Sequence, residues 1–302
     1  MDPIFIIGAP RSGTSVTNWA IGQHPNIQVM PETAWIAAYV TGAISSFRKG
    51  SERGKFSHLS NVKFPIENYL RYIAASIDGV VHEAYEMRCQ RLYGDYRSKG
   101  IGINPENPNP GYQVRRSPDD PKRRWIDATP LNKQFTWALA QAFPNARFIH
   151  NLRDPVSVAL SLEHFNRVGA EAQSLSDGLK TWMLHTENAW LTEKAFGSDR
   201  VFRLDFDRLE DEPSRLIRDV LHFLEEDWCE DCLAPLATKT NSSEVERDRG
   251  REMKRVALNS DYRKAKKLYQ DLSQEVSDEQ RQSAMHELEQ LVDTHLTNRP
   301  LL

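Results

Sequence analysis

Apolar residues at the start of the chain form one short run followed by a helical repeat. Residues 3–8 read Pro-Ile-Phe-Ile-Ile-Gly, and a short apolar run closed by glycine is typical of a buried parallel strand. Residues from about 12 to 23 have helical spacing, and the turn His24-Pro25-Asn26 ends that pattern. A strand, a glycine-containing turn and a helix in this order predict the start of an α/β domain.

The remaining pattern predicts further alternation of helices and strands. Helical spacing covers residues 33–47 and 66–93, and the polar, basic residues 48–65 between them indicate an exposed loop. Residues 94–121 are rich in proline and glycine, as in a long irregular segment such as a substrate lid. Later strands are predicted at 124–128, 147–152 and 201–205, and later helices at 132–143, 155–165, 175–195, 213–224 and, charged and amphipathic, 260–296.

These elements predict one α/β domain over residues 1–302: a P-loop-type parallel sheet flanked by helices, with a helical C-terminal extension at 258–302. The net charge of −3 provides no global basic field for nucleic acid. No run approaches the roughly 18 apolar residues that span a bilayer, and the N-terminus lacks the features of a signal peptide. We therefore expect a soluble, cytoplasmic protein.

Cysteine spacing gives one candidate metal motif. Cys229 and Cys232 have a spacing found in zinc sites, but a structural zinc ion needs four ligands, commonly from two such pairs. We interpret the two residues as thiols near a helix end, with a local disulfide left open under oxidation.

Candidate chemistry begins at residues 8–15, Gly-Ala-Pro-Arg-Ser-Gly-Thr-Ser. Two glycines five positions apart, between a strand and a helix, are typical of a loop whose backbone N–H groups cradle an anion. In a nucleotide triphosphatase a lysine follows the second glycine and grips the phosphates, but Thr14 stands at that position and the cation of the loop is Arg11. A glycine-rich turn with an exposed arginine is the alternative interpretation.

The sequence from Ile6 to Ser15, followed by His24-Pro25 and Glu32-Thr33, resembles the sulfotransferase superfamily, in particular tyrosylprotein sulfotransferases and related bacterial sulfotransferases. The similarity in motif order extends from about residue 4 to residue 255. It implies an enzyme that uses 3′-phosphoadenosine 5′-phosphosulfate (PAPS). Arg11, Ser12, Gly13, Thr14 and Ser15 would then bind the 5′-phosphosulfate.

A second anion site is implied at residues 151–161. Arg153 follows a predicted strand, and Ser161 lies about two turns into the next helix. The resemblance implies that this Arg–Ser pair binds the 3′-phosphate of PAPS, and an arginine fork with a hydroxyl suits a phosphate dianion. The alternative is a local Arg153–Asp154 ion pair with Ser161 facing solvent. Two separate anion sites would distinguish PAPS from ATP, which has no 3′-phosphate.

Glu32 is the candidate general base. It matches the position of the catalytic glutamate in tyrosylprotein sulfotransferases, and Arg11 would stabilise charge on the transferring sulfuryl group and the leaving phosphate. The alternative is that Glu32 is an acid at the start of the helix at 33–47, stabilised by the helix dipole. The resemblance requires no metal ion.

The resemblance also implies later contacts to the nucleotide. Phe206 stands where the family has an aromatic residue, usually tyrosine, near the adenine, and ordinary core packing is its alternative role. Ser243, Arg247 and Lys254 lie in a segment similar to the loop that closes over the nucleotide; a solvated charged loop is the alternative.

One position departs from the family. Tyrosylprotein sulfotransferases have a catalytic lysine just before the Thr-Pro pair, and this sequence has Ala128 there, which argues against a tyrosine sulfotransferase. The densest basic cluster nearby could serve an anionic acceptor or simply solvate a loop; it comprises Arg115, Arg116, Lys122, Arg123 and Arg124.

The sequence thus predicts transfer of a sulfuryl group from PAPS to an acceptor hydroxyl on a carbohydrate, lipid or small metabolite, with 3′,5′-ADP as the product. A homodimer is compatible with this prediction. The competing predictions are a P-loop nucleotide kinase or triphosphatase, and a non-catalytic nucleotide-binding protein of the same fold.

Overall fold

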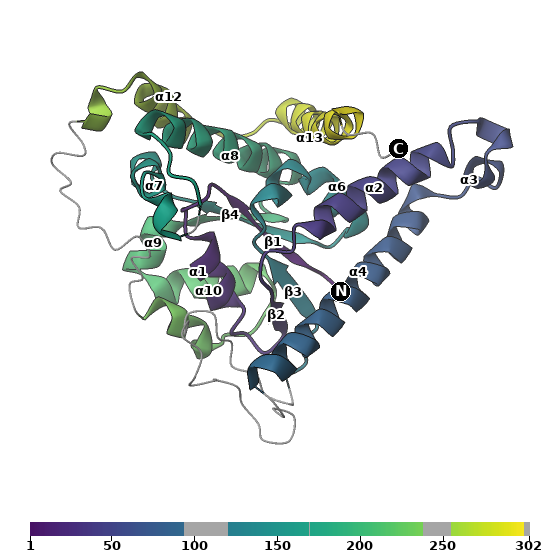
Figure 1. Cartoon of the computed structure of the whole chain (residues 1–302), viewed down its shortest axis with the longest axis horizontal. Coiled ribbons are helices and arrows are strands. Elements are labelled where there is room, and N and C mark those ends of the chain that lie inside the picture. The colour runs from purple at the N-terminus through teal and green to yellow at the C-terminus, as the bar shows by residue number, and fades with distance from the viewer. Residues whose placement is uncertain (94–119, 169, 238–254, 299–302) are drawn as a thin grey trace.

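Strands from distant parts of the chain form a parallel five-stranded sheet with helices on both faces (Figure 1). The computed structural model describes residues 1–93, 120–168, 170–237 and 255–298. Neighbouring strands follow the order β2-β3-β1-β4-β5 and every pair is parallel, which confirms the predicted fold class. The strands are β1 (Ile4–Gly8), β2 (Ile27–Val29), β3 (Arg124–Asp127), β4 (Arg147–Leu152) and β5 (Val201–Asp205).

The register of the strands decides which loops meet. Gly8 at the end of β1 pairs with Asn151 of β4, and Leu152 of β4 pairs with Asp205 of β5. The carboxyl ends of β1, β4 and β5 therefore lie side by side. The strand order also reverses beside β1, and such a switch point at the carboxyl edge is where open α/β sheets bind ligands.

Helices of very different length surround this sheet. The longer helices are α1 (Thr14–Ile21), α2 (Trp35–Lys49), α4 (Ile66–Tyr93), α6 (Thr136–Ala142), α7 (Pro155–Leu162), α8 (Leu175–Phe196), α9 (Phe206–Asp211), α10 (Pro213–Phe223), α12 (Ser260–Asp271) and α13 (Asp278–Asn298). The shorter turns are η1 (Gly54–Phe56), α3 (His58–Asn61), η3 (Pro130–Gln134), η4 (Phe165–Val168) and η5 (Glu230–Leu236).

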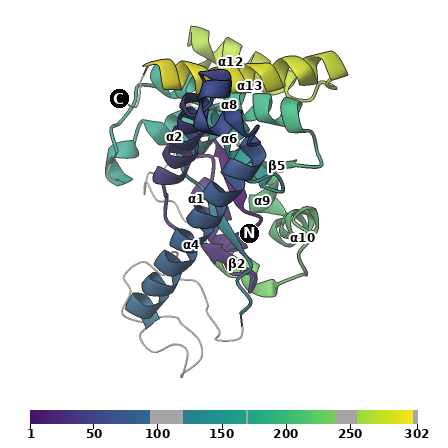
Figure 2. The same cartoon turned by 90° about the vertical axis from the view of Figure 1, so that its right-hand side faces the viewer.

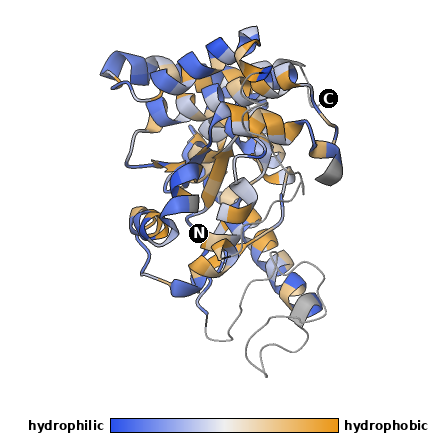
Figure 3. Cartoon of the chain, turned by 90° about the vertical axis from the view of Figure 1, so that its left-hand side faces the viewer, coloured by the Kyte–Doolittle hydropathy of each residue, from blue (hydrophilic) through white to orange (hydrophobic). Residues whose placement is uncertain are grey.

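Side chains of β1 alternate between two apolar cores, as the period of two in a strand requires. Phe5 and Ile7 pack with residues of α2, α4 and α6 on one face of the sheet. Ile4 and Ile6 pack with residues of α1 and α10 on the other face. Figure 3 shows the resulting apolar centre at the strands. Burial on both faces explains why the first strand is a continuous apolar run.

The structure differs from the predicted elements at several places: residues 48–65, predicted as a loop, contain η1 and α3, and the helix α9 was not predicted. The predicted helix at 132–143 is the 3₁₀ turn η3 followed by α6, and the short strand β2 was not predicted. The predicted single helix at 260–296 is two helices, α12 and α13, which both pack against α8 (Figure 2). None of the described helices is long and apolar enough to cross a bilayer.

Candidate active site

The loop between β1 and α1 has an unusual backbone path. Gly8, Arg11 and Gly13 all have positive φ angles, of 145°, 68° and 91°. The backbone N–H and the Oγ of Ser12 both donate to the carbonyl of Ala9, at 3.2 and 2.6 Å, which closes the turn. Alternating left-handed residues allow successive N–H groups to face one side, as in anion-binding nests. Ser12 is fully buried and uses both of its donors within the loop, so it shapes that loop, and its contact with a 5′-phosphosulfate stays a prediction.

Helix α1 begins immediately after this loop with an N-terminus that accepts an anion. Its N-cap, Gly13, makes no side-chain cap, and the first turn contains no acidic residue. The first intrahelical hydrogen bond runs from Thr17 N to the Gly13 carbonyl at 3.0 Å, so the N–H groups of Thr14 and Ser15 have no carbonyl within the helix to bond. The site predicted from residues 8–15 therefore has the donors that a phosphate or sulfate group needs.

Phe206 packs directly against this loop. A Cβ atom added to Gly13 would lie 2.0 Å from the Phe206 ring, so the ring occupies the space that any other side chain at position 13 would need. The Arg153 guanidinium lies over the same ring, 4.6 Å from its centroid. Phe206 thus joins the loop after β1 to the residue after β4. The predicted contact of this ring with adenine stays a prediction.

The two predicted anion sites are directly connected. Arg11 Nε donates to Ser161 Oγ at 2.9 Å, and Arg153 Nη1 donates to the backbone carbonyl of Arg11 at 3.2 Å. Asp154 is the N-cap of α7, so it has a structural role of its own beside Arg153. Ser161 is nearly fully buried. The structure therefore brings together Arg11, Arg153 and Ser161, which are far apart in the sequence.

Glu32 lies at the same edge of the sheet, after β2. The next residue, Thr33, donates its hydroxyl to Asp127 Oδ2 at 2.8 Å and its backbone N–H to Thr129 Oγ1 at 2.8 Å. Asp127 is fully buried at the end of β3, and it also accepts from Asn132 Nδ2 at 2.9 Å. The polar end of β3 thus holds the segment that carries Glu32.

The environment of Glu32 suits a proton acceptor. Although the residue is exposed overall, partial burial of its carboxylate, and then the charge of Asp127, raise its pKa above the usual value. Helix α2 has Ala34 as its N-cap and no acidic residue in its first turn, so Glu32 is not an acid of that first turn. A carboxylate with a raised pKa is a stronger base.

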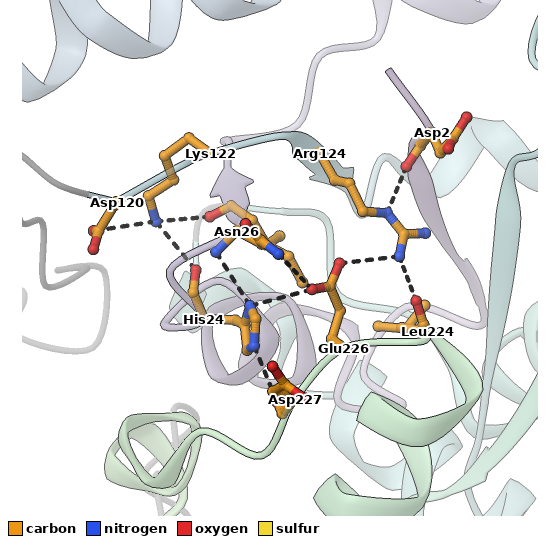
Figure 4. Close-up of polar contacts among 10 residues, drawn as sticks. Asp2, His24, Asn26, Asp120, Lys122, Arg124, Leu224, Glu226 and Asp227 are labelled. Atoms are coloured by element: carbon orange, nitrogen blue, oxygen red, sulfur yellow. Dashed lines mark hydrogen bonds and ion pairs between the residues drawn. The ribbon is translucent and has the colours of Figure 1, made fainter.

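The basic residues near β3 have roles that sequence analysis did not predict. Lys122 is 2% exposed and donates its Nζ to the carbonyl of His24 at 3.2 Å. Arg124 donates to the carbonyl of Leu224 at 2.6 Å and pairs with Glu226 at 3.3 Å (Figure 4). Both residues lie at the amino end of β3, opposite the loop after β1. The expectation that they serve an anionic acceptor or solvate a loop is therefore wrong for these two.

Other predicted residues lie outside the part of the chain that the structure describes. They are Arg115 and Arg116 of the basic cluster, and Ser243, Arg247 and Lys254 of the predicted nucleotide-closing loop.

A second cation near the loop was missed by sequence analysis. Lys133 of η3 is 2% exposed and donates its Nζ to the Pro130 carbonyl at 2.9 Å. The same atom lies 3.0 Å from His185 Nε2, and His185 Nδ1 lies 3.1 Å from the carbonyl of Gly8. Burial lowers the pKa of Lys133 to about 8, and burial together with the lysine charge lowers that of His185 to about 4. Lys133 stands between Asn132 and Gln134, so the local sequence did not indicate its burial.

The cysteines are free thiols, as interpreted from the sequence. Contact between the two side chains lowers the pKa of Cys229 to about 7 and raises that of Cys232. The described residues contain no cluster of three or more histidine, cysteine or acidic side chains that could hold a metal ion.

Comparison with known proteins identifies the family of the chain. The model of the sulfotransferase family matches residues 3–230, and the chain belongs to that family. An uncharacterised protein of Aquifex aeolicus is 25% identical over 244 residues, which are 78% of this chain and 27% of that protein. The chain thus spans about a quarter of the length of this relative.

Two solved structures align with most of the chain. The sulfotransferase domain of the Synechococcus PCC 7002 olefin synthase is 18% identical, with a TM-score of 0.45 over 97% of this chain and 94% of that chain. The sulfotransferase of Alicyclobacillus acidocaldarius is 17% identical, with a TM-score of 0.46 over 95% of this chain and 99% of that chain.

Proposed function

We propose that this chain transfers a sulfuryl group from PAPS to the hydroxyl of an acceptor. The observation that carries the proposal is the connection of two anion sites through Arg11. This residue belongs to the loop that faces the N-terminus of α1, its side chain bonds Ser161, and its carbonyl bonds Arg153. PAPS carries one anionic group at each end of its ribose, and the two sites lie at the ends of the adjacent strands β1 and β4.

The donor fits the residues present. The N–H groups of the first turn of α1 and the guanidinium of Arg11 would hold the 5′-phosphosulfate, since both offer donors to an anion. Arg153 and Ser161 would hold the 3′-phosphate. PAPS supplies the sulfuryl group, and no residue of the chain needs to become covalently modified.

Glu32 would accept the proton of the acceptor hydroxyl. The acceptor oxygen then forms a bond to sulfur while the bond from sulfur to the bridging phosphate oxygen breaks, and 3′,5′-ADP leaves with the bonding electrons. Arg11 would stabilise the negative charge that develops on the leaving phosphate. The sulfated product keeps the acceptor oxygen, and Glu32 keeps the proton until it passes to water.

A groove beside Glu32 indicates the acceptor side. Its volume is about 420 Å³, its surface is largely apolar, and it is lined by Met30, Pro31, Ala84, Tyr85, Met87, Arg88 and Arg91. Met30 and Pro31 directly precede Glu32, and the groove lies between the segment after the outer strand β2 and the end of α4, while Arg153 follows β4 on the other side of β1. Among carbohydrate, lipid and small-metabolite acceptors, this groove favours one with an apolar body and an anionic group for Arg88 or Arg91.

Nucleotide binding separates this proposal from its rivals. Thermal unfolding would be followed with 3′,5′-ADP, 5′-AMP and ATP–Mg²⁺, and a ligand at 100 times its Kd stabilises by about 2.7 kcal/mol. We expect 3′,5′-ADP to protect best, because it alone carries both anionic groups. Protection by ATP–Mg²⁺ without protection by 3′,5′-ADP would favour a kinase or triphosphatase and refute the proposal.

The role of Glu32 is tested by the variant Glu32→Gln. We expect unchanged binding of 3′,5′-ADP and a loss of transfer of about 10²–10⁴-fold, the usual contribution of a general base. A matched control is Glu83→Gln, an exposed glutamate on α4 outside the lining of the groove. Unchanged turnover in Glu32→Gln would remove Glu32 from the mechanism.

Three further expectations accompany this function. Transfer should not depend on a metal ion, so dialysis against EDTA should leave the rate unchanged. A cytoplasmic location and a homodimer stay predictions, which fractionation of cells and sedimentation of the purified chain would test.

A further inference from the structure

Lys133, His185 and the carbonyl of Gly8 form a chain of hydrogen bonds whose direction is fixed by chemistry. An ammonium group has only donors, so Lys133 Nζ donates to His185 Nε2 at 3.0 Å. The proton of the neutral imidazole therefore sits on Nδ1, which donates to the Gly8 carbonyl at 3.1 Å. The low pKa of His185, about 4, keeps this ring neutral near pH 7.

The Gly8 carbonyl belongs to the first peptide of the anion-binding loop. A carbonyl oxygen carries partial negative charge, and one that turned toward a bound phosphosulfate would repel it. The next carbonyl, that of Ala9, is already engaged by the backbone and hydroxyl of Ser12. Gly8 has φ of 145°, a conformation that residues with side chains rarely adopt. Because glycine has no side chain, the residue itself does not restrict rotation of its peptide group. His185 supplies the bond that fixes the first carbonyl.

A lysine is a costly choice for this buried position. Lys133 is 2% exposed, and burial lowers its pKa to about 8 because the charged form loses its solvation. A methionine has similar length without that cost. Two other titratable side chains contact residues near Lys133 in the sequence: Asp127 bonds Asn132, and His295 packs against Phe135. They contact neighbours of Lys133, and its own polar partners are the Pro130 carbonyl and His185.

We propose that Lys133 and His185 are positioning residues for the phosphosulfate loop: the lysine fixes the histidine in its Nδ1–H form, and the histidine holds the Gly8 carbonyl away from the bound anion. The pair acts on the 5′ side of the ligand only, because Arg153 and Ser161 on the 3′ side do not depend on this peptide. This inference rests on the proposed function, since it needs a 5′ anion in the loop.

The test compares ligands that differ only at the 5′ end. Binding of 3′,5′-ADP and of 3′-AMP would be measured by calorimetry for the wild type, Lys133→Met, His185→Leu and His185→Asn. We expect both His185→Leu and Lys133→Met to weaken the binding of 3′,5′-ADP by about tenfold, which corresponds to the loss of one net hydrogen bond. The affinity for 3′-AMP should change by no more than a factor of about two. The asparagine amide can donate where Nδ1–H did, so His185→Asn should restore most of the affinity.

Measurements of unfolding temperature distinguish a positioning role from a role in packing alone. Lys133→Met should unfold at the same or a higher temperature than the wild type, because it removes a buried charge, while its affinity for 3′,5′-ADP falls. The inference would be overturned by any of three results: an equal loss of affinity for 3′,5′-ADP and 3′-AMP, an unchanged affinity for 3′,5′-ADP, or an affinity that His185→Asn does not restore. If His185→Leu does not fold, the affinities of Lys133→Met and His185→Asn still test the positioning role. Wild-type protein that binds neither ligand would instead refute the proposed function.

Discussion

The glycine at position 13 is the most confined point of the candidate site, and its replacement by alanine should be severely destabilising. The added Cβ would lie 2.0 Å from Phe206 Cε2 and 2.1 Å from Cδ2, closer than real Cβ contacts occur. Phe206 is only 8% exposed and lies beneath Arg153, so its ring has little room to retreat. Gly13 also has φ of 91°, which strains any L residue.

Two costs therefore add in Gly13→Ala. The left-handed backbone costs about 1–2 kcal/mol, and forced overpacking costs a further ~1–3 kcal/mol. The expected loss in the free energy of unfolding is then about 2–5 kcal/mol. Gly54→Ala is the matched control: Gly54 has φ of 54° but nothing within 4 Å of an added Cβ, so only the backbone cost applies.

The assay is equilibrium unfolding in urea for both glycine variants, for Phe206→Ala and for the double variant Gly13→Ala/Phe206→Ala. Removal of the ring relieves the clash but not the backbone strain. The double variant should thus lose about 1–3 kcal/mol less than the sum of the two single variants. Equal losses for Gly13→Ala and Gly54→Ala, or simple additivity in the double variant, would refute the reasoning.

Three other expectations follow from the charges at the site. Asp127→Asn removes a charge that raises the pKa of Glu32, so the acidic limb of the kcat/KM profile should move to lower pH; a limb that stays in place contradicts this. Arg153→Met should weaken the binding of 3′,5′-ADP by about 10–100-fold in calorimetry and leave the affinity for 5′-AMP unchanged. Equal losses of affinity for the two nucleotides would contradict a 3′-phosphate site. The folded-state pKa of Lys133 is about 8, below its usual 10.5, so its burial penalty is complete below pH 8 and disappears as the pH rises toward 10.5. Any difference in unfolding temperature between wild type and Lys133→Met should shrink over that interval, and a constant difference would contradict the assignment.

The parallel sheet was predictable because β1 is a continuous apolar run and the later main strands are short segments that alternate with helical patterns. β4 and β5 were predicted at their observed bounds, although β4 is almost wholly buried and β5, at the edge of the sheet, is only partly buried. The three residues of β2 are too few to show a period. The break at residues 272–277 between α12 and α13 contains no glycine or proline. Its one local signal is the capping box that Ser277 and Gln280 form at the start of α13, and sequence analysis missed it.

The candidate site likewise contains residues that the sequence predicts and residues that only the structure shows. Arg11 and Arg153 were found because each lies in a local motif at a strand end. Lys133 and His185 belong to different elements, and only the packing of η3 on α8 brings them together. Lys122 was misinterpreted although a usable signal existed: it precedes a parallel strand and must therefore lie at the edge opposite the loops that bind ligands.

Arg11 joins the two halves of the candidate site: it belongs to the loop before α1, and its carbonyl and side chain bond Arg153 and Ser161 of the second half. In the proposed enzyme, the separation between the two anion positions would thus be held by the hydrogen bonds of a single residue and would not have to be established by the ligand. A site of this kind selects ligands by the distance between their two anionic groups as well as by their charge. In the proposed enzyme, a nucleotide isomer with its second phosphate on the 2′ oxygen would carry the same charge and yet engage one half of the site at a time.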